Sequence, residues 1–174
     1  IYMASLMETI IDVLVKEEET YRLLIELSKK KTPIIINNDL DGLAKITEEE
    51  QDVVSEIQKY EKLRMQTMKD IADVTKHTGE ELKLPDLIDM MSSRPSEQGQ
   101  LREIHDKLKV TLDNMKRINE QNRELLQNSI DMVNFEINLL QAARRAPETA
   151  DYDKGAYSTG SIMGSGTKTF DSRS

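Results

Sequence analysis

One segment, residues 101–140, decides the fold class, and its sequence is LREIHDKLKVTLDNMKRINEQNRELLQNSIDMVNFEINLL. A residue suited to a helix interface recurs along it every three or four positions, which places these residues on one face of an α-helix. We expect a helix from about Ser96 to Ala143, roughly 70 Å long by the standard rise. The stripe consists of Leu101, Ile104, Leu108, Leu112, Met115, Ile118, Asn122, Leu125, Ser129, Met132 and Leu139.

The same spacing predicts a helix near the start of the chain. It begins at the capping box Ser5–Glu8 and ends at Lys29–Pro33, because a basic last turn and a proline are typical of helix ends. Residues 33–36 are then expected to form an extended connector that leads to an N-cap near Asp39. The stripe of this helix is Leu6, Ile10, Val13, Glu17, Tyr21, Leu24 and Leu27.

A further helix is predicted from near Asp39 to His77–Gly79. A second capping box at Thr47–Glu50 offers a later start, but the apolar phase is unbroken across this point, which favours the earlier one. Its stripe is Leu43, Ile46, Glu50, Val53, Ile57, Tyr60, Arg64, Met68 and Ile71. Residues 80–96 hold two prolines and an apolar patch, and they predict a short helix folded over the end of the bundle.

These elements predict an all-α fold, an elongated antiparallel three-helix bundle or coiled coil with a short extra helix in the second connection. The composition agrees, because only 4% of residues are aromatic and there are just 7 glycines and 4 prolines. We expect a helical bundle over residues 3–145. Residues 146–174 are rich in Gly, Ser, Thr and Asp, which indicates a flexible, low-complexity tail.

Charge and composition exclude several classes of function. The formal net charge is −8, so most of the surface would repel nucleic acids and anionic membranes. There is no cysteine, hence no disulfide and no thiolate nucleophile, which suits a reducing compartment. No apolar run approaches the ~20 residues that span a bilayer, and no export signal is visible, so no stable membrane insertion is expected. We therefore expect a cytoplasmic protein.

The sequence offers no site for chemistry. Only two histidines are present, His77 and His105, and neither stands in the Glu-x-x-His spacing that metal-binding helix bundles use. No glycine-rich phosphate loop follows a strand or opens a helix. The acidic runs Glu17–Glu19 and Glu48–Glu50 are interpreted as solvated helix faces. No metal, no cofactor and no enzymatic activity are expected.

Pairing the predicted helices side by side suggests their register. Residues Ile71 and Leu101 would lie close together, as would Ile57 and Met115, and the polar pair Glu50 and Asn122 would share a layer. The longest helix then extends past its partners. Only the connector at residues 33–36 remains to cover a group of large apolar side chains, and such exposed patches mark interaction sites. The group is Met132, Val133, Phe135, Ile137, Leu139 and Leu140.

Two features allow more than one interpretation. The nine methionines either fill the core or form an adaptable binding surface, and core filling is favoured. Asn119 and Asn122, three positions apart near the stripe, form either a polar layer that fixes helix register or part of a partner-binding surface; the register layer is favoured on physical grounds.

The layout resembles the FlgN-like flagellar export chaperones, which serve the hook-filament junction proteins. Three segments carry the likeness: IQKYEKLR at 57–64, INEQNRELL at 118–126 with its paired asparagines and leucines, and YDKG at 152–155. It covers about Leu6 to Gly155. The resemblance implies a cytoplasmic, non-ATPase chaperone that binds the C-terminal helical segment of hook-associated proteins and presents them to the export gate.

The resemblance also extends the set of candidate partner-binding residues. To the exposed apolar group it adds Asn119, Asn122, Leu125 and Leu126, with Tyr152 and Tyr157 as candidates for the client or the export gate. One alternative is a coiled-coil adaptor or oligomerisation scaffold, which would self-associate through the same stripe. The other is a related chaperone for the filament or cap protein, which would differ only in its client.

Overall fold

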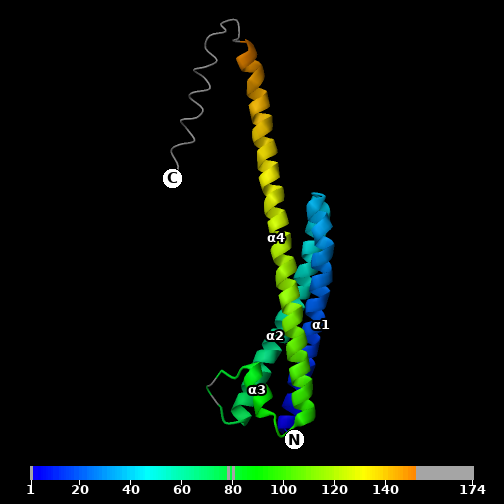
Figure 1. Ribbon diagram of the computed structural model, residues 1–174, viewed down its shortest axis with the longest axis vertical. Helices are drawn as coiled ribbons and strands as arrows, with labels where there is room; N and C mark the ends of the chain where they lie inside the picture. The colour runs from blue at the N-terminus through cyan, green and yellow to red at the C-terminus, as the bar shows by residue number, and fades with distance from the viewer. Residues whose placement is uncertain (1, 78, 80, 152–174) are drawn as a thin grey trace. The chain divides into compact units, whose positions relative to one another are not determined.

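The computed structural model describes residues 2–77, 79 and 81–151, with side chains up to residue 145. These residues form helices and turns without a strand (Figure 1). The helices are α1 (Tyr2–Ile36), α2 (Leu40–Val74), α3 (Leu84–Met90) and α4 (Pro95–Asp151). The chain falls into two units, Ile1–Ser129 and Ile130–Ser174, and each is described by itself. The expected all-α fold is confirmed.

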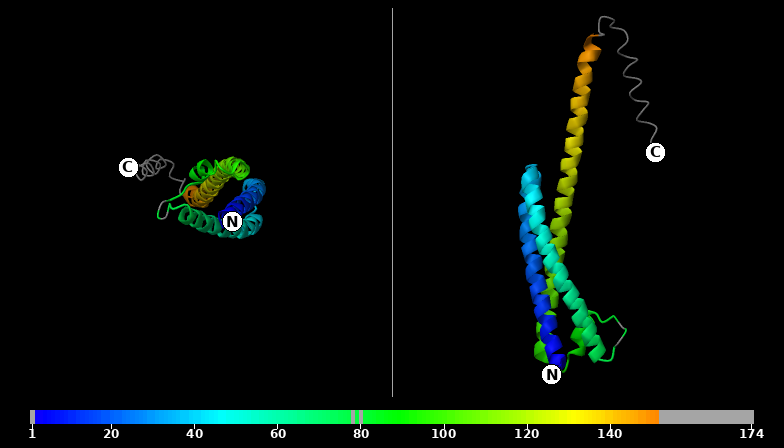
Figure 2. Two further views of the ribbon diagram at one scale, coloured as in Figure 1. Left: turned by 90° about the horizontal axis from the view of Figure 1, so that it is seen from below. Right: turned by 180° about the vertical axis from the view of Figure 1, so that it is seen from behind.

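The first unit is an antiparallel three-helix bundle. Helices α1 and α2 lie side by side in opposite directions, and the part of α4 up to Ser129 packs along them (Figures 1 and 2). The short helix α3 lies in the connection between α2 and α4, close to the end of α2 (Figure 1). The bundle and the extra helix in the second connection are therefore as predicted.

A tight turn joins α1 to α2. Asn38 has a positive φ of 53°, and its N–H donates to Ile35 O, so a left-handed residue ends α1. Asp39 is the N-cap of α2, and its carboxylate accepts from the N–H of Gly42 at 3.0 Å. A Cβ at Gly42 would collide with this carboxylate, so the Asp39 side chain would have to shift if another residue stood there. The predicted start near Asp39 is confirmed, and the later start at Thr47 is wrong.

The predicted end of the first helix at Pro33 is wrong, because α1 continues through this proline to Ile36. Proline carries a helical φ, but it removes one hydrogen bond and crowds the preceding turn. Burial of Ile35, which is 2% exposed, offsets this by about 1.5–3 kcal/mol. Thr32 adds a hydrogen bond to Asn122 of α4. The expected extended connector at residues 33–36 is therefore helical, and the true connector is the turn at 37–39.

The predicted capping box at Ser5–Glu8 is also wrong. Helix α1 already includes Tyr2, so Ser5 lies within the helix and its carbonyl accepts from the Thr9 hydroxyl. Met3 packs on the core as a partly buried side chain. Packing of this first turn outweighs the local capping signal, which is worth only about 1 kcal/mol.

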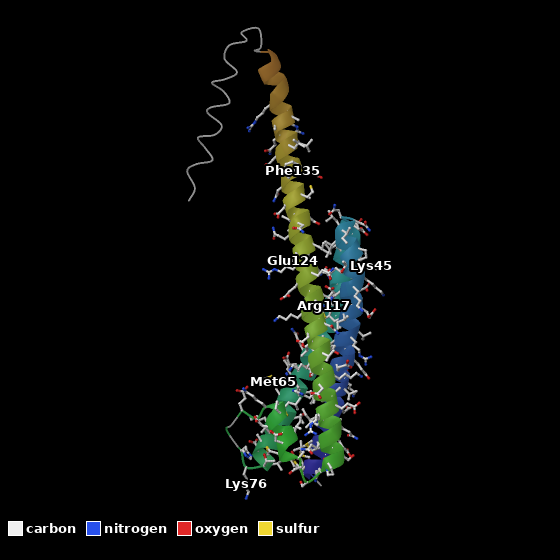
Figure 3. The ribbon with its side chains drawn as sticks, in the orientation of Figure 1. Lys45, Met65, Lys76, Arg117, Glu124 and Phe135 are labelled. Carbon is white, nitrogen blue, oxygen red and sulfur yellow. The ribbon has the colours of Figure 1, made fainter. Side chains whose placement is uncertain are left out.

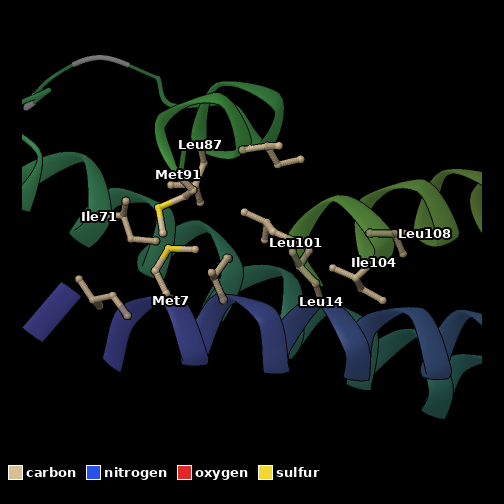
Figure 4. Packing of buried hydrophobic residues seen from close by; sticks show 11 residues of the cluster. Met7, Leu14, Ile71, Leu87, Met91, Leu101, Ile104 and Leu108 are labelled. Atoms are coloured by element: carbon tan, nitrogen blue, oxygen red, sulfur yellow. The ribbon is translucent and has the colours of Figure 1, made fainter. Parts of the chain in front are cut away.

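The main core lies where all four helices meet, and Figure 4 shows it from close by. Met7 of α1, Ile71 of α2, Leu87 of α3 and Leu101 of α4 are all completely buried there. A second cluster, nearer the turn between α1 and α2, joins α1, α2 and α4. Its members are Leu24, Ile25, Ile57, Met115 and Ile118. The predicted neighbours Ile71 with Leu101 and Ile57 with Met115 therefore share clusters, and the expected register is confirmed.

Helix α4 departs from the prediction at one stripe position and at its C-terminal end. Thr111 faces inward and is 6% exposed, whereas the predicted stripe residue Leu112 is 39% exposed. The helix runs on to Asp151, beyond the expected end at Ala143 and through Pro147, whose φ is compatible with a helix. Near its start, the Gln98 amide donates to Ile88 O of α3 at 2.8 Å, which ties the two helices together.

Candidate functional site

Buried charges occupy the middle of the bundle. Glu17 of α1 is 3% exposed and faces Arg64 of α2, with 3.4 Å between Oε2 and Nε. These two atoms form no hydrogen bond among the described residues, although both are buried. Arg64 also approaches Glu61, on its own helix, at 3.6 Å. The pair is held by charge attraction without good hydrogen-bond geometry, so it stabilises the fold only while both partners are present.

A second buried carboxylate links α1 to α4. Glu18 is 1% exposed, accepts from the Thr111 hydroxyl at 2.9 Å and lies 3.0 Å from Nε of Arg22. Lys107 of α4 contributes a more distant positive charge at 3.8 Å. The carboxylate is therefore both hydrogen-bonded and charge-paired, as a buried carboxylate must be to avoid a large desolvation cost.

A third polar layer lies near the C-terminal end of α1. Asn122 of α4 donates to Ser28 O at 2.8 Å, and the Thr32 hydroxyl donates to its amide oxygen at 2.6 Å. The Ser28 hydroxyl donates in turn to Glu50 of α2 at 3.3 Å, and Lys31 lies 2.9 Å from the same carboxylate. Glu50 and Asn122 thus share one layer through α1, as the register predicted, and Asn122 occupies the position expected of a register-fixing residue.

The interpretation of the acidic runs as solvated faces is wrong for three of their members. Glu17 and Glu18 are buried and Glu50 is partly buried, whereas Glu19, Glu48 and Glu49 are exposed. The sequence held a signal for two of them, because Glu17 and Glu50 occupy stripe positions of their helices. Glu18 lies beside the stripe, and its carboxylate accepts from Thr111, an inward-facing residue that the predicted stripe missed.

The other candidate surface lies in the second unit, on α4. Its large apolar side chains are all at least 46% exposed, and Figure 3 shows side chains projecting from the helix around Phe135. The exposed fractions are Ile130 52%, Met132 58%, Val133 48%, Phe135 60%, Ile137 46%, Leu139 59% and Leu140 65%. The expected exposure of the segment from Met132 to Leu140 is present, with Ile130 as an additional member that the sequence analysis missed.

The remaining candidate residues belong to the first unit or lie outside the described residues. Asn119 is exposed and borders a shallow hollow that Leu112, Lys116 and Arg123 also line. Leu125 and Leu126 are half-buried, and Asn122 is buried against α1. Tyr152 and Tyr157 lie outside the described residues, as does the whole predicted tail from Tyr152 onward.

Two negative findings concern the described part of the chain only. Within residues 2–77, 79 and 81–151, no group of three or more His, Asp or Glu side chains is arranged to hold a metal ion. Among the same residues, no helix has a stretch long and apolar enough to cross a bilayer.

Comparison with known proteins gives the family. A family model described as FlgN protein matches residues 3–158, which is most of the chain. The chain belongs to the FlgN family. Neither the curated proteins nor the solved structures contain a match. The resemblance stated from the residue patterns is thereby confirmed, and it covers both the bundle and the exposed segment of α4.

Membership of the FlgN family indicates a flagellar export chaperone. The family is one of chaperones and is not known for enzymatic activity. For a FlgN protein the relevant chemistry is therefore protein binding. Of the two features described above, the polar layers join helices of the chain to one another, whereas the apolar segment of α4 has unburied surface to offer a partner.

The buried Glu17 makes stability depend on pH. Burial raises the pKa of Glu17 above its ordinary value of 4.5; Arg64 opposes this and Glu61 adds to it. Since the folded state holds the proton more tightly, the contribution of Glu17 to stability falls as pH rises above 4.5. We expect the free energy of unfolding of Glu17→Gln, minus that of the wild type, to grow as the pH rises above 4.5. Urea unfolding followed by circular dichroism measures both values.

The exposed Glu19 on the same helix provides the control. Glu19→Gln removes the same charge from a solvated position, so its stability should follow the wild type across this pH range. A difference for Glu17→Gln that stays constant or shrinks with rising pH would contradict the assignment.

Proposed function

We propose that this FlgN protein is a cytoplasmic chaperone that binds the C-terminal helical segment of flagellar hook-associated proteins along the α4 segment from Met132 to Leu140. Binding would keep these clients from assembling prematurely and deliver them to the export gate. The observation that carries the proposal is the group of large apolar side chains, each 46% to 65% exposed, over about two and a half turns of one helix. An amphipathic helix laid along them would bury its own apolar face at the same time.

The expected energy of this contact is sufficient for specific binding. Fully burying one exposed large apolar side chain contributes about 1.5–3 kcal/mol, and each side chain of the segment that a client covers can contribute about half of this, because 46% to 65% of it is exposed. Part of this gain is lost to the ordering of side chains and to the loss of translational freedom. The remainder is compatible with a complex that forms in the cell and releases its client at the export apparatus.

Substitutions at the centre of the segment test the proposal. Phe135→Asp and Leu139→Asp should each weaken binding of a purified hook-associated protein C-terminal segment by about tenfold or more, because a charge then faces the apolar client. Isothermal titration calorimetry measures the affinity, and far-ultraviolet circular dichroism verifies that helicity is unchanged. Both side chains are exposed, so neither substitution disturbs the core.

Val110→Asp is the matched control, because Val110 lies on the same helix and is 61% exposed but belongs to the bundle unit. It should leave the affinity unchanged. Equal affinities for Phe135→Asp, Leu139→Asp and the wild type would refute the proposed site.

Self-association is the second candidate function, because the same apolar face could pack on another copy of the chain. Light scattering of the protein with and without the client segment separates the two. A monomer that forms a complex with the client supports the chaperone, whereas a stable oligomer that ignores the client supports the scaffold.

A further inference from the structure

The exposed segment of α4 carries two separate apolar rows. Within residues 130–145, apolar side chains follow the three-four spacing twice, with a polar row of the same spacing on the remaining side. The first apolar row is Ile130, Val133, Ile137 and Leu140. The second is Met132, Phe135 and Leu139. The polar row is Asp131, Asn134, Asn138 and Gln141.

The two rows point in different directions. With about 100° between successive residues of an α-helix, their mean directions lie about 150° apart. The stripe by which a helix packs on one side of a core is about 100° wide. A single partner helix that covered the first row would therefore leave the second row in water, and all seven side chains in the two rows are now 46% to 65% exposed.

One charged side chain lies between the rows. Glu136 falls on the side of α4 opposite the polar row, flanked by apolar residues of both rows, and it is exposed in the free chain. It forms no ion pair within the described residues. Any partner that covers both rows would enclose this carboxylate, and an enclosed carboxylate needs a cation or hydrogen-bond donors.

The bundle shows how this chain accommodates inward-facing glutamates. Glu17 faces Arg64, Glu18 lies against Arg22 and Thr111, and Glu50 lies against Lys31 and Ser28. In each case a positively charged side chain lies within 3.4 Å of the carboxylate. The same requirement at Glu136 has to be met by the partner.

A second copy of the chain meets this requirement poorly. Pairing about a two-fold axis near the middle of the segment would bring Glu136 against its own counterpart, and two enclosed carboxylates without a cation repel each other. Only a pairing shifted to an axis near Leu140 would bring Arg144 of one copy toward Glu136 of the other. The charge pattern therefore favours a client that carries a positive charge over a copy of this chain with a net charge of −8.

We propose that the end of α4 binds two amphipathic helices of its client at once, one on each apolar row, with a lysine or arginine of the client placed against Glu136. This proposal rests on the proposed function and specifies the client segment: a helical pair with a basic side chain in its otherwise apolar contact face. In the complex α4 would become the third helix of a small mixed bundle.

Calorimetry with the C-terminal segment of a hook-associated protein tests the two rows separately. Ile137→Asp disrupts the first row and Leu139→Asp the second, and each should weaken binding by about tenfold or more. A client segment truncated to its last helix should also bind about tenfold or more weakly than the segment with its last two helices. Both substitutions lie at exposed positions, and circular dichroism checks that the helix content is kept.

A charge reversal tests the role of Glu136. Glu136→Lys should weaken binding by about fivefold or more, and a client in which the apposed lysine or arginine is changed to glutamate should restore it. Glu124→Lys is the matched control, because it makes the same charge change at an exposed position of α4 outside the segment; it should alter the affinity by less than about twofold.

The outcomes separate the two proposals. If Leu139→Asp weakens binding and Ile137→Asp does not, or if the last client helix alone binds as well as the last two, the client is a single helix, so the further proposal fails while the proposed function stands. If Leu139→Asp does not weaken binding, the proposed function itself fails. If Glu136→Lys weakens binding no more than Glu124→Lys, the basic client residue is refuted. If the row variants dissociate a dimer in the absence of client, the second row belongs to another copy of the chain.

Discussion

Replacing Leu101 by alanine should lower the free energy of unfolding by about 2–5 kcal/mol. Leu101 is completely buried where all four helices meet, in one cluster with Met7, Ile71 and Leu87 (Figure 4). The smaller side chain leaves a cavity that rigid neighbours on three other helices cannot fill. Urea denaturation followed by circular dichroism measures the loss, and the same experiment shows whether the transition stays cooperative.

The control is the same substitution on the same helix at an exposed position. Leu140→Ala removes the same atoms from a side chain that is 65% exposed, so it should change stability by less than about 0.5 kcal/mol. Equal losses for the two variants would mean that Leu140 is buried in solution, which would contradict both the described exposure and the proposed use of the segment for binding.

The helices and their register could be predicted from the sequence because both depend on a repeated pattern. A three-four apolar spacing has only one stable arrangement, with the stripes facing each other. Once α2 and α4 are connected through the folded segment that holds α3, the positions of Ile71 and Leu101 are set relative to each other, and the neighbours further along follow. The clusters confirm both neighbouring pairs.

The helix ends and the buried charges could not be predicted in the same way. Pro33 and Ser5 carry strong local signals for a helix end and a helix start, but tertiary packing on α2 and α4 overrides signals worth 1–3 kcal/mol. Glu18 is buried and accepts from the Thr111 hydroxyl of α4. Both Thr111 and Leu112 satisfy the three-four spacing between Leu108 and Met115, so the periodic pattern alone cannot decide which of the two faces inward.

The candidate site was predictable in its location and less so in its composition. The predicted helix extends past its partners, which placed the site at residues 132–140. These residues are exposed, and Ile130 extends the exposed group by two residues. Asn122, by contrast, matched the family pattern yet forms two hydrogen bonds within the bundle. A family motif shows that a residue is important without showing its role. The contacts with neighbouring helices are needed to tell whether the residue fixes the helix register or binds a client.

Replacing Arg64 by methionine should lower the free energy of unfolding by about 3 kcal/mol at neutral pH, the lower end of the range for breaking a buried ion pair. Glu17 is then left as a buried carboxylate without its cation. The lower end applies because 35% of the Arg64 side chain is exposed, so water already screens part of the attraction. Chemical denaturation measures the loss. Lys62→Met, which removes an exposed cation from the same helix, should cost less than about 0.5 kcal/mol.

The double variant Glu17→Leu with Arg64→Met decides whether the cost comes from the stranded charge. A matched apolar pair needs no hydrogen bonds, and neither Glu17 Oε2 nor Arg64 Nε has one in the described residues, so the double variant should regain the wild-type stability or exceed it by about 1–4 kcal/mol. If it stays as unstable as Arg64→Met, the arginine stabilises α2 by packing of its aliphatic part and the ion pair contributes little. If Glu17→Leu alone is as stable as the wild type, while Arg64→Met is not, the desolvated carboxylate is the source of the loss.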